Sequence, residues 1–163
     1  MKTYSFSEDN ARGSAMEHLV ACMLRAVCGF EVTEQYRTGT RSSIDGAKIT
    51  VDGYVYPSAT WPSGLCYESK WQDVSGSAHK KLPYYLIDAA AGLYPAPLLF
   101  IIDGAFFCKM DAGKKAFSWM KSQVDGEKIV GVMNTSEFVT WCQRHGGRTA
   151  PDYIEQPQLT MGV

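Results

Sequence analysis

The run from Leu98 to Ile102 restricts the fold most strongly, because its five residues are all apolar and two of them are β-branched. A strand without alternating polar residues is typical of the middle of a sheet that is covered on both faces. Helical patterns precede and follow it: one begins near Pro83 and ends at Gly92, and the other runs from Ala112 to Val124. These patterns predict an α/β domain with helices on both faces of one sheet.

The other elements follow from their periodicity. Ser14 and Glu17 form a capping box before an apolar helical pattern, which predicts a helix from about Ala15 to Cys28 that ends at Gly29. The polar residues 1–12 are predicted to be a loosely attached arm. The remaining predicted elements are strands at Phe30–Tyr36, Lys48–Tyr56, Leu65–Gln72 and Ile129–Met133, and a last helix capped by Thr135 or Ser136 that ends at Cys142.

This order predicts a mixed five-stranded sheet. At 163 residues the chain has the size of a single domain. We expect the core to span about 12–145 and the tail 146–163 to be irregular, since it has no periodicity.

Charged residues stand on one side of the third strand. Glu68 and Lys70 are two residues apart and therefore point to the same side of a strand, and Gln72 continues that row. Residues with turn chemistry separate this strand from the one before it, which predicts a hairpin. The hairpin brings Asp52 close to Glu68 or Ser69 on the neighbouring strand.

Two carboxylates on adjacent strands suit a hard divalent cation. Mg²⁺ prefers oxygen ligands and keeps several waters and phosphate oxygens, so one or two carboxylates suffice. A nearby lysine can orient or deprotonate a metal-bound water. The alternative is an exposed ion pair on an edge strand, worth at most about 1 kcal/mol. Asp45 is a rival to Asp52, but Asp45-Gly46 is a tight-turn signal, and the two aspartates would lie about 23 Å apart in a strand.

Asp52, Glu68, Ser69 and Lys70 resemble the D…E-x-K signature of the PD-(D/E)XK nuclease superfamily, with Val51 where a proline often stands. The resemblance covers roughly residues 10–104. It implies a restriction-endonuclease-like core and a Mg²⁺-dependent endonuclease that cleaves DNA, with Mn²⁺ as a substitute. It further implies that Asp52 and Glu68 hold the metal with the Ser69 carbonyl, and that Lys70 positions the attacking water.

Two further residues are candidates for the site. As the third residue of the predicted helix, Glu17 caps the backbone in one interpretation. In the other, it completes the metal site directly or through water, as the resemblance to resolvase-like members implies. Gln72 is expected to steady Lys70 or a phosphate.

A net charge of −1 means that any DNA affinity must come from local clusters of basic residues. The segment Arg37–Ser43 is predicted to be a flexible loop that contacts phosphates, and a solvated loop is the alternative. Residues before Pro83 line the positive end of a predicted helix, where solubilising charges are the alternative. The candidate DNA contacts are Arg12, Arg37, Arg41, Ser75, Lys80 and Lys81.

The Gly-Ser-Ala-x-Glu sequence at residues 13–17 is similar to archaeal-type Holliday junction resolvases, which implies a branched DNA substrate. Symmetric cleavage requires two active sites, so a homodimer is expected. The Ser-Gly-Ser-Ala run at 75–78 resembles restriction-type members and makes a compact type II restriction-like enzyme the alternative. A catalytically silent DNA-binding module is a second alternative, although it would not need Asp52, Glu68 and Lys70 together.

The compartment is inferred from the cysteines and from hydropathy. Five cysteines, an odd number without a Cys-x-x-Cys pair, indicate reduced thiols and a cytoplasmic protein. No run of 18 apolar residues and no secretory leader is visible, so no membrane association is expected.

Overall fold

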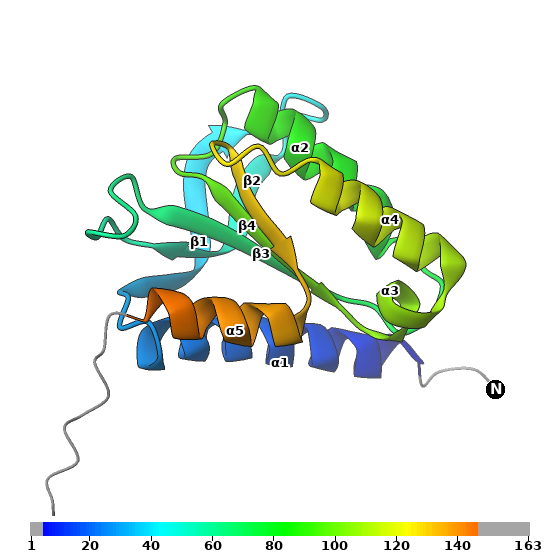
Figure 1. The fold of residues 1–163 in the computed structure, drawn as a ribbon. Coiled ribbons are helices and arrows are strands. Elements are labelled where there is room, and N and C mark those ends of the chain that lie inside the picture. The colour runs from blue at the N-terminus through cyan, green and yellow to red at the C-terminus, as the bar shows by residue number, and fades with distance from the viewer. Residues whose placement is uncertain (1–4, 147–163) are drawn as a thin grey trace, which may run out of the picture.

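The computed structural model describes residues 5–146, which form one mixed sheet between two layers of helices (Figure 1). The strands lie in the order β1-β2-β3-β4-β5; β1 to β3 are antiparallel neighbours, and β3, β4 and β5 are parallel. This confirms the predicted α/β fold class. The elements are α1 (Ser5–Ala26), β1 (Val32–Arg41), β2 (Lys48–Val55), β3 (Leu65–Trp71), the short 3-10 helix η1 (Ala78–Lys81), α2 (Leu82–Ala90), β4 (Leu98–Asp103), α3 (Ala105–Lys109), α4 (Asp111–Ser122), β5 (Ile129–Met133) and α5 (Thr135–His145).

Two apolar clusters hold the layers together, one on each face of the sheet. Helices α1 and α5 cover one face, and α2, α3 and α4 cover the other (Figure 1). Within β4, Leu99 and Ile101 point into the first cluster, whereas Leu98, Phe100 and Ile102 point into the second. All five side chains are buried, as the uninterrupted apolar run predicted. Burial of each contributes about 1.5–3 kcal/mol.

The first helix and the first strand are longer than predicted. Helix α1 begins at Ser5, so the residues expected to form a loose arm are largely helical. The apolar pattern starts only at Met16, the first residue of α1 in the core cluster. The pattern therefore predicted a start of the helix that is too late in the chain. Strand β1 continues to Arg41, so most of the predicted loop is strand. Its polar residues are accommodated by side-chain hydrogen bonds, for example from the Thr40 hydroxyl to the Leu93 carbonyl at 2.6 Å.

Three smaller features in the second half of the chain differ from the prediction. The cap of α5 is Asn134, not Thr135 or Ser136; its side chain accepts from the Glu137 N–H at 2.8 Å, in a complete capping box. The five-residue helix α3 was missed because it is too short for periodicity to show. The predicted helix ended at Val124, but Val124 is exposed and lies beyond the end of α4. The predicted irregular tail lies, apart from Gly146, outside the described residues.

No helix in the described part of the chain has the length and apolarity that a bilayer crossing requires.

The pairing between β2 and β3 is short and ends at a glycine. Only three residue pairs join the two strands, and the last of them is Gly53 with Tyr67. A Cβ atom on Gly53 would lie 2.2 Å from the buried Tyr67 ring, so no other residue fits without displacing that ring. The close approach lets Tyr67 fill the core directly beneath the point where the strands separate.

We expect Gly53→Ala to lower the free energy of unfolding by about 1–3 kcal/mol, because it overpacks the core against a ring that cannot move away. Chemical denaturation would measure the loss. Gly13→Ala is the matched control: Gly13 lies within α1 with no atom within 4 Å of a built Cβ, so this change should stabilise the protein by about 0.5–1 kcal/mol. Equal stability of wild type and Gly53→Ala would contradict the packing described here.

Candidate active site

Asp52, Glu68, Ser69 and Lys70 meet where β2 and β3 separate. The Asp52 Oδ2 atom accepts a hydrogen bond from the Ser69 N–H at 2.7 Å and from the Ser69 hydroxyl at 3.1 Å. The Lys70 Nζ atom lies 2.9 Å from Glu68 Oε2 and 3.5 Å from Asp52 Oδ2. The hairpin therefore places Asp52 beside Ser69, as predicted, and Glu68 and Lys70 share one side of β3.

The separation of the strands leaves a backbone carbonyl of β3 without a strand partner in β2. Beyond Gly53 and Tyr67, β2 no longer pairs with β3, and the Asp52 carboxylate takes the place of a strand carbonyl as the acceptor for the Ser69 N–H. The N–H and C=O of one strand residue point to the same side. The Ser69 carbonyl therefore faces the opening between the two strands, next to the Asp52 carboxylate.

Burial and the neighbouring charges act in opposite directions on the pKa values of Glu68 and Lys70. Glu68 is only 1% exposed, and this burial, opposed by the neighbouring Lys70 ammonium, raises the pKa of Glu68 to about 7. Burial also disfavours the charged form of Lys70, but the carboxylates of Glu68 and Asp52 together raise the Lys70 pKa above its usual range. Lys70 is thus a cation held by two acidic groups. The alternative of an exposed ion pair on an edge strand is wrong, because β3 is the central strand.

The donor set fits a hard divalent cation with an incomplete protein shell. Two carboxylates and one lysine leave a net negative charge, and a carbonyl oxygen lies beside them. Across residues 5–146, no group of three or more His, Cys, Asp or Glu side chains could hold a metal ion. A cation bound by Asp52, Glu68 and the Ser69 carbonyl would complete its shell with water and phosphate oxygens, which Mg²⁺ does readily.

Glu17 faces this site from α1. It lies well inside the helix, which begins at Ser5, so the capping interpretation is wrong. Its carboxylate accepts a hydrogen bond from the Gln35 amide at 3.0 Å. Burial and then the negative charge of Asp52 raise the pKa of Glu17. Glu17 is therefore close enough to Asp52 for the Asp52 carboxylate to affect the pKa of Glu17.

Gln35 has an unusual backbone that the sequence did not indicate. Its φ angle is +50°, and it is the one non-glycine residue with a positive φ among those the structure describes. This left-handed conformation costs about 1–2 kcal/mol for a residue with a Cβ. Such strain concentrates at functional sites, and Gln35 is adjacent in β1 to Glu34, whose pairing partner in β2 is Gly53.

Tyr85 is a second residue near the site that sequence reasoning missed. It lies on α2, and its ring centroid is 5.5 Å from Lys70 Nζ. Burial, with the nearby charge of Glu68, raises the pKa of Tyr85 to about 12. The hydroxyl therefore stays protonated as a donor beside the carboxylates. Pro83 predicted the helix, but no local signal showed which of its side chains would reach β3.

The side chain of Gln72 does not hydrogen-bond to Lys70, one of the two partners predicted for it, and a contact with phosphate stays a prediction. Its side-chain amide donates to the Val74 carbonyl at 2.9 Å and accepts from the His79 N–H at 3.2 Å. The side chain is buried and holds the loop after β3 against the start of η1. Its hydrogen bonds therefore support the loop that carries Ser75, and none of them reaches the lysine.

A family profile described as the PD-(D/E)XK nuclease superfamily domain matches residues 9–146. This chain belongs to the PD-(D/E)XK nuclease superfamily. The match supports nuclease activity, with DNA as the substrate and a divalent metal ion as the cofactor typical of the superfamily. No curated protein matches the chain.

The candidate DNA contacts of this PD-(D/E)XK domain lie in three places. Arg37 and Arg41 are exposed on β1, and Arg41 donates to the Gly46 carbonyl at 2.8 Å in the turn. Lys80 and Lys81 are exposed at η1 and the start of α2, after the exposed Ser75. Arg12 is separate from both groups: it pairs with Asp73 just beyond the end of β3.

Proposed function

We propose that this protein is a Mg²⁺-dependent endonuclease that hydrolyses phosphodiester bonds in DNA, with Mn²⁺ as a substitute, and that the whole chain acts as one nuclease domain. The observation that carries the proposal is the meeting of Asp52, Glu68 and Lys70 within hydrogen-bonding range at the separation of β2 and β3. Two carboxylates and a lysine on the neighbouring strands β2 and β3 can hold a cation and a water in a fixed arrangement.

Each residue has a distinct role in this proposal. Asp52, Glu68 and the Ser69 carbonyl hold the cation. Bound there, the ion stabilises charge on the phosphoryl oxygens and lowers the pKa of its water. Lys70 orients the attacking water through its ammonium group, which two carboxylates hold in place. We assign Glu17 to a metal-bound water, because it reaches the site from α1 and one of its oxygens already accepts from the Gln35 amide.

The hairpin formed by β1 and β2 supplies the first phosphate contacts. Arg37 lies opposite Thr50, and Arg41 lies opposite Lys48, all four exposed. The basic side chains of Arg37, Arg41 and Lys48 therefore lie along the hairpin at increasing distance in sequence from Asp52. Arginine and lysine at these positions suit contacts with a phosphate backbone. Ser75, Lys80 and Lys81, close to the N-terminus of α2, form a second phosphate site in this proposal.

The substrate we favour is branched DNA, and the functional unit we favour is a homodimer. The exposed cations are suited to following the DNA backbone, which fits recognition of shape better than recognition of sequence. Symmetric cleavage of two strands requires two active sites. A compact type II restriction-like enzyme and a catalytically silent DNA-binding module are the alternatives. The five free cysteines support a reducing cytoplasm as the compartment.

The substrate assignment can be tested by competition. The protein is offered equal amounts of a four-way junction and a pool of linear duplexes of many sequences, in Mg²⁺ at moderate salt. Paired symmetric nicks near the branch point would support a resolvase-like enzyme. Double-strand cuts at one short motif, with junctions left intact, would support the restriction-like alternative. Binding without any cleavage would support the silent module.

Mg²⁺ affinity should fall as the pH falls below 7. The Glu68 carboxyl has a pKa of about 7, and the metal binds its deprotonated form, so protons compete with Mg²⁺ below that pH. We expect up to about a tenfold loss of affinity per pH unit below 7 and a plateau above it. A Mg²⁺ titration of the thermal unfolding midpoint at several pH values measures this, with Glu68→Gln as the variant that lacks the titrating group. Equal affinity at pH 6 and pH 8 would contradict the role of Glu68.

A further inference from the structure

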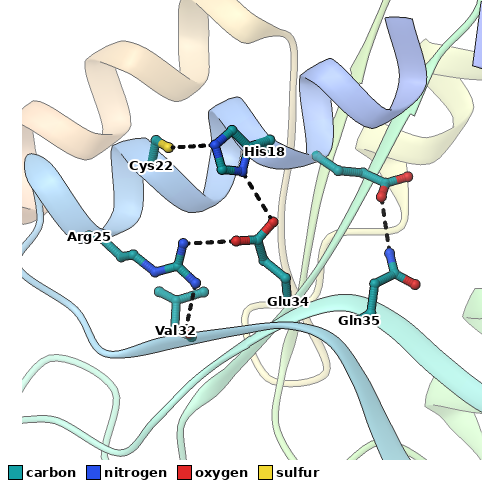
Figure 2. A network of polar contacts seen from close by, with 7 residues as sticks. His18, Cys22, Arg25, Val32, Glu34 and Gln35 are labelled. Carbon is teal, nitrogen blue, oxygen red and sulfur yellow. Dashed lines mark hydrogen bonds and ion pairs between the residues drawn. The ribbon is translucent and has the colours of Figure 1, made fainter. Parts of the chain in front are cut away.

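Two consecutive residues of β1 both reach the same helix. Glu34 Oε1 accepts from the Arg25 guanidinium at 2.8 Å, and its other oxygen lies 3.4 Å from His18 Nδ1 (Figure 2). The next residue, Gln35, donates from its amide to Glu17 on the same helix at 3.0 Å. In a regular strand, consecutive side chains point to opposite faces of the sheet, so one of the two should have pointed away from α1.

The left-handed backbone at Gln35 explains this arrangement, because β1 changes face there. Val32 packs in the cluster that α1 covers, whereas Tyr36 packs in the cluster on the other face, under α2. Residues four apart in a regular strand would share a face. The pairing with β2 keeps the same register on both sides of the change, so no residue is inserted. Gln35, with its positive φ, lies between Val32 and Tyr36, where this reversal takes place.

Strand β2 makes the same change opposite Gln35. Val55 packs in the cluster under α1, and Val51 packs in the cluster under α2, although four residues separate them. Asp52 lies within this reversal and is the position that faces Gln35 when the register is continued from Glu34 and Tyr36. Asp52 and Gln35 are therefore neighbours on adjacent strands, at the point where the side chains of both strands change from one face of the sheet to the other.

We propose that the strained backbone of Gln35 serves to aim its amide at Glu17, which makes Gln35 a positioning residue for the metal site. This inference rests on the proposed function. The amide occupies one oxygen of the Glu17 carboxylate and leaves the other free to accept a hydrogen bond from a metal-bound water. The contacts of Glu34 with Arg25 and His18 fix the strand against α1 one residue earlier.

Replacing Gln35 with glycine distinguishes a role in positioning Glu17 from a purely structural role of Gln35. At a φ of +50°, glycine removes the strain and also removes the amide. Gln35→Gly should therefore leave the thermal unfolding midpoint unchanged or raise it, yet weaken Mn²⁺ binding about 10–100-fold, as loss of a partner that orients a ligand does. Thr33→Gly is the matched control: Thr33 is exposed on the same strand and contacts Tyr56, so its loss should lower stability and leave Mn²⁺ affinity unchanged.

A double variant tests whether Gln35 acts through Glu17. If it does, Glu17→Gln combined with Gln35→Gly should bind Mn²⁺ within about twofold of Glu17→Gln alone. A Gln35→Gly protein that is less stable than wild type and binds Mn²⁺ equally well would overturn the inference. If Gln35→Gly weakens Mn²⁺ binding but the wild-type protein cleaves no DNA, the nuclease proposal is overturned and the positioning role of Gln35 is retained. A wild-type protein that binds no Mn²⁺ would overturn both.

Discussion

Replacing Lys70 with methionine is expected to reduce Mg²⁺-dependent DNA cleavage by about 10²–10⁴-fold, the range typical of losing a group that handles a proton in the transition state. Methionine keeps the length of the side chain and removes the charge that lies 2.9 Å from Glu68. Single-turnover cleavage measures the loss. Lys114→Met, on the exposed face of α4, is the control and should cleave as wild type does. Cleavage by Lys70→Met within tenfold of wild type would remove Lys70 from the mechanism.

Lys70→Met should also change stability, because the lysine is largely buried and not at the strand surface. Removing one partner of a buried ion pair costs about 3–5 kcal/mol when the other must stay charged. Glu68 can escape part of this cost by taking up a proton, since burial raises its pKa to about 7 against the opposing Lys70 ammonium, and the variant removes that opposition. The variant should therefore be less stable than wild type above pH 7 and recover as the pH falls, and Mg²⁺ should raise its unfolding midpoint more than that of wild type.

Asp52→Asn is expected to have the second large effect. Asparagine retains an oxygen that can accept from the Ser69 N–H, so the separation of β2 and β3 should persist. The lost charge removes a metal ligand, and a metal supplies several kcal/mol of transition-state stabilisation, which corresponds to roughly 10²–10³-fold in rate. Mg²⁺ titration and cleavage assays measure the two consequences.

Asp45→Asn provides the matched control for that variant. Asp45 lies in the exposed turn before β2, where its carboxylate accepts from the Ala47 N–H at 2.9 Å, and asparagine can accept the same bond. We expect wild-type cleavage from Asp45→Asn. Loss of activity in Asp45→Asn with retention in Asp52→Asn would show that the wrong aspartate has been assigned to the metal.

The sheet and its hairpin were predictable because their signals are local. The apolar run of β4 indicated a strand covered on both faces, and the turn chemistry before β3 brought Asp52 beside Ser69. Period-two spacing placed Glu68 and Lys70 together. Each of these inferences depends only on residues near one another in the chain, together with general strand geometry.

The parts that were not predictable depend on contacts between distant segments. Gln35 has a left-handed backbone and its amide contacts Glu17 on another element, and nothing in the residues around Gln35 indicates either feature. Tyr85 reaches Lys70 only once α2 has packed on β3. Helix α1 begins at Ser5, whereas its apolar pattern begins only at Met16, so periodicity alone did not indicate where the helix starts.

The most direct test of the central claim is nicking of supercoiled plasmid by the wild-type protein in Mg²⁺ and, in parallel, in EDTA. The assignment of Asp52, Glu68 and Lys70 predicts nicked or linear product in Mg²⁺, restored activity with Mn²⁺ after EDTA treatment, and intact plasmid with Asp52→Asn or Lys70→Met under every condition. Full cleavage in EDTA, or cleavage by both variants at the wild-type rate, would contradict a metal-dependent nuclease site at the separation of β2 and β3.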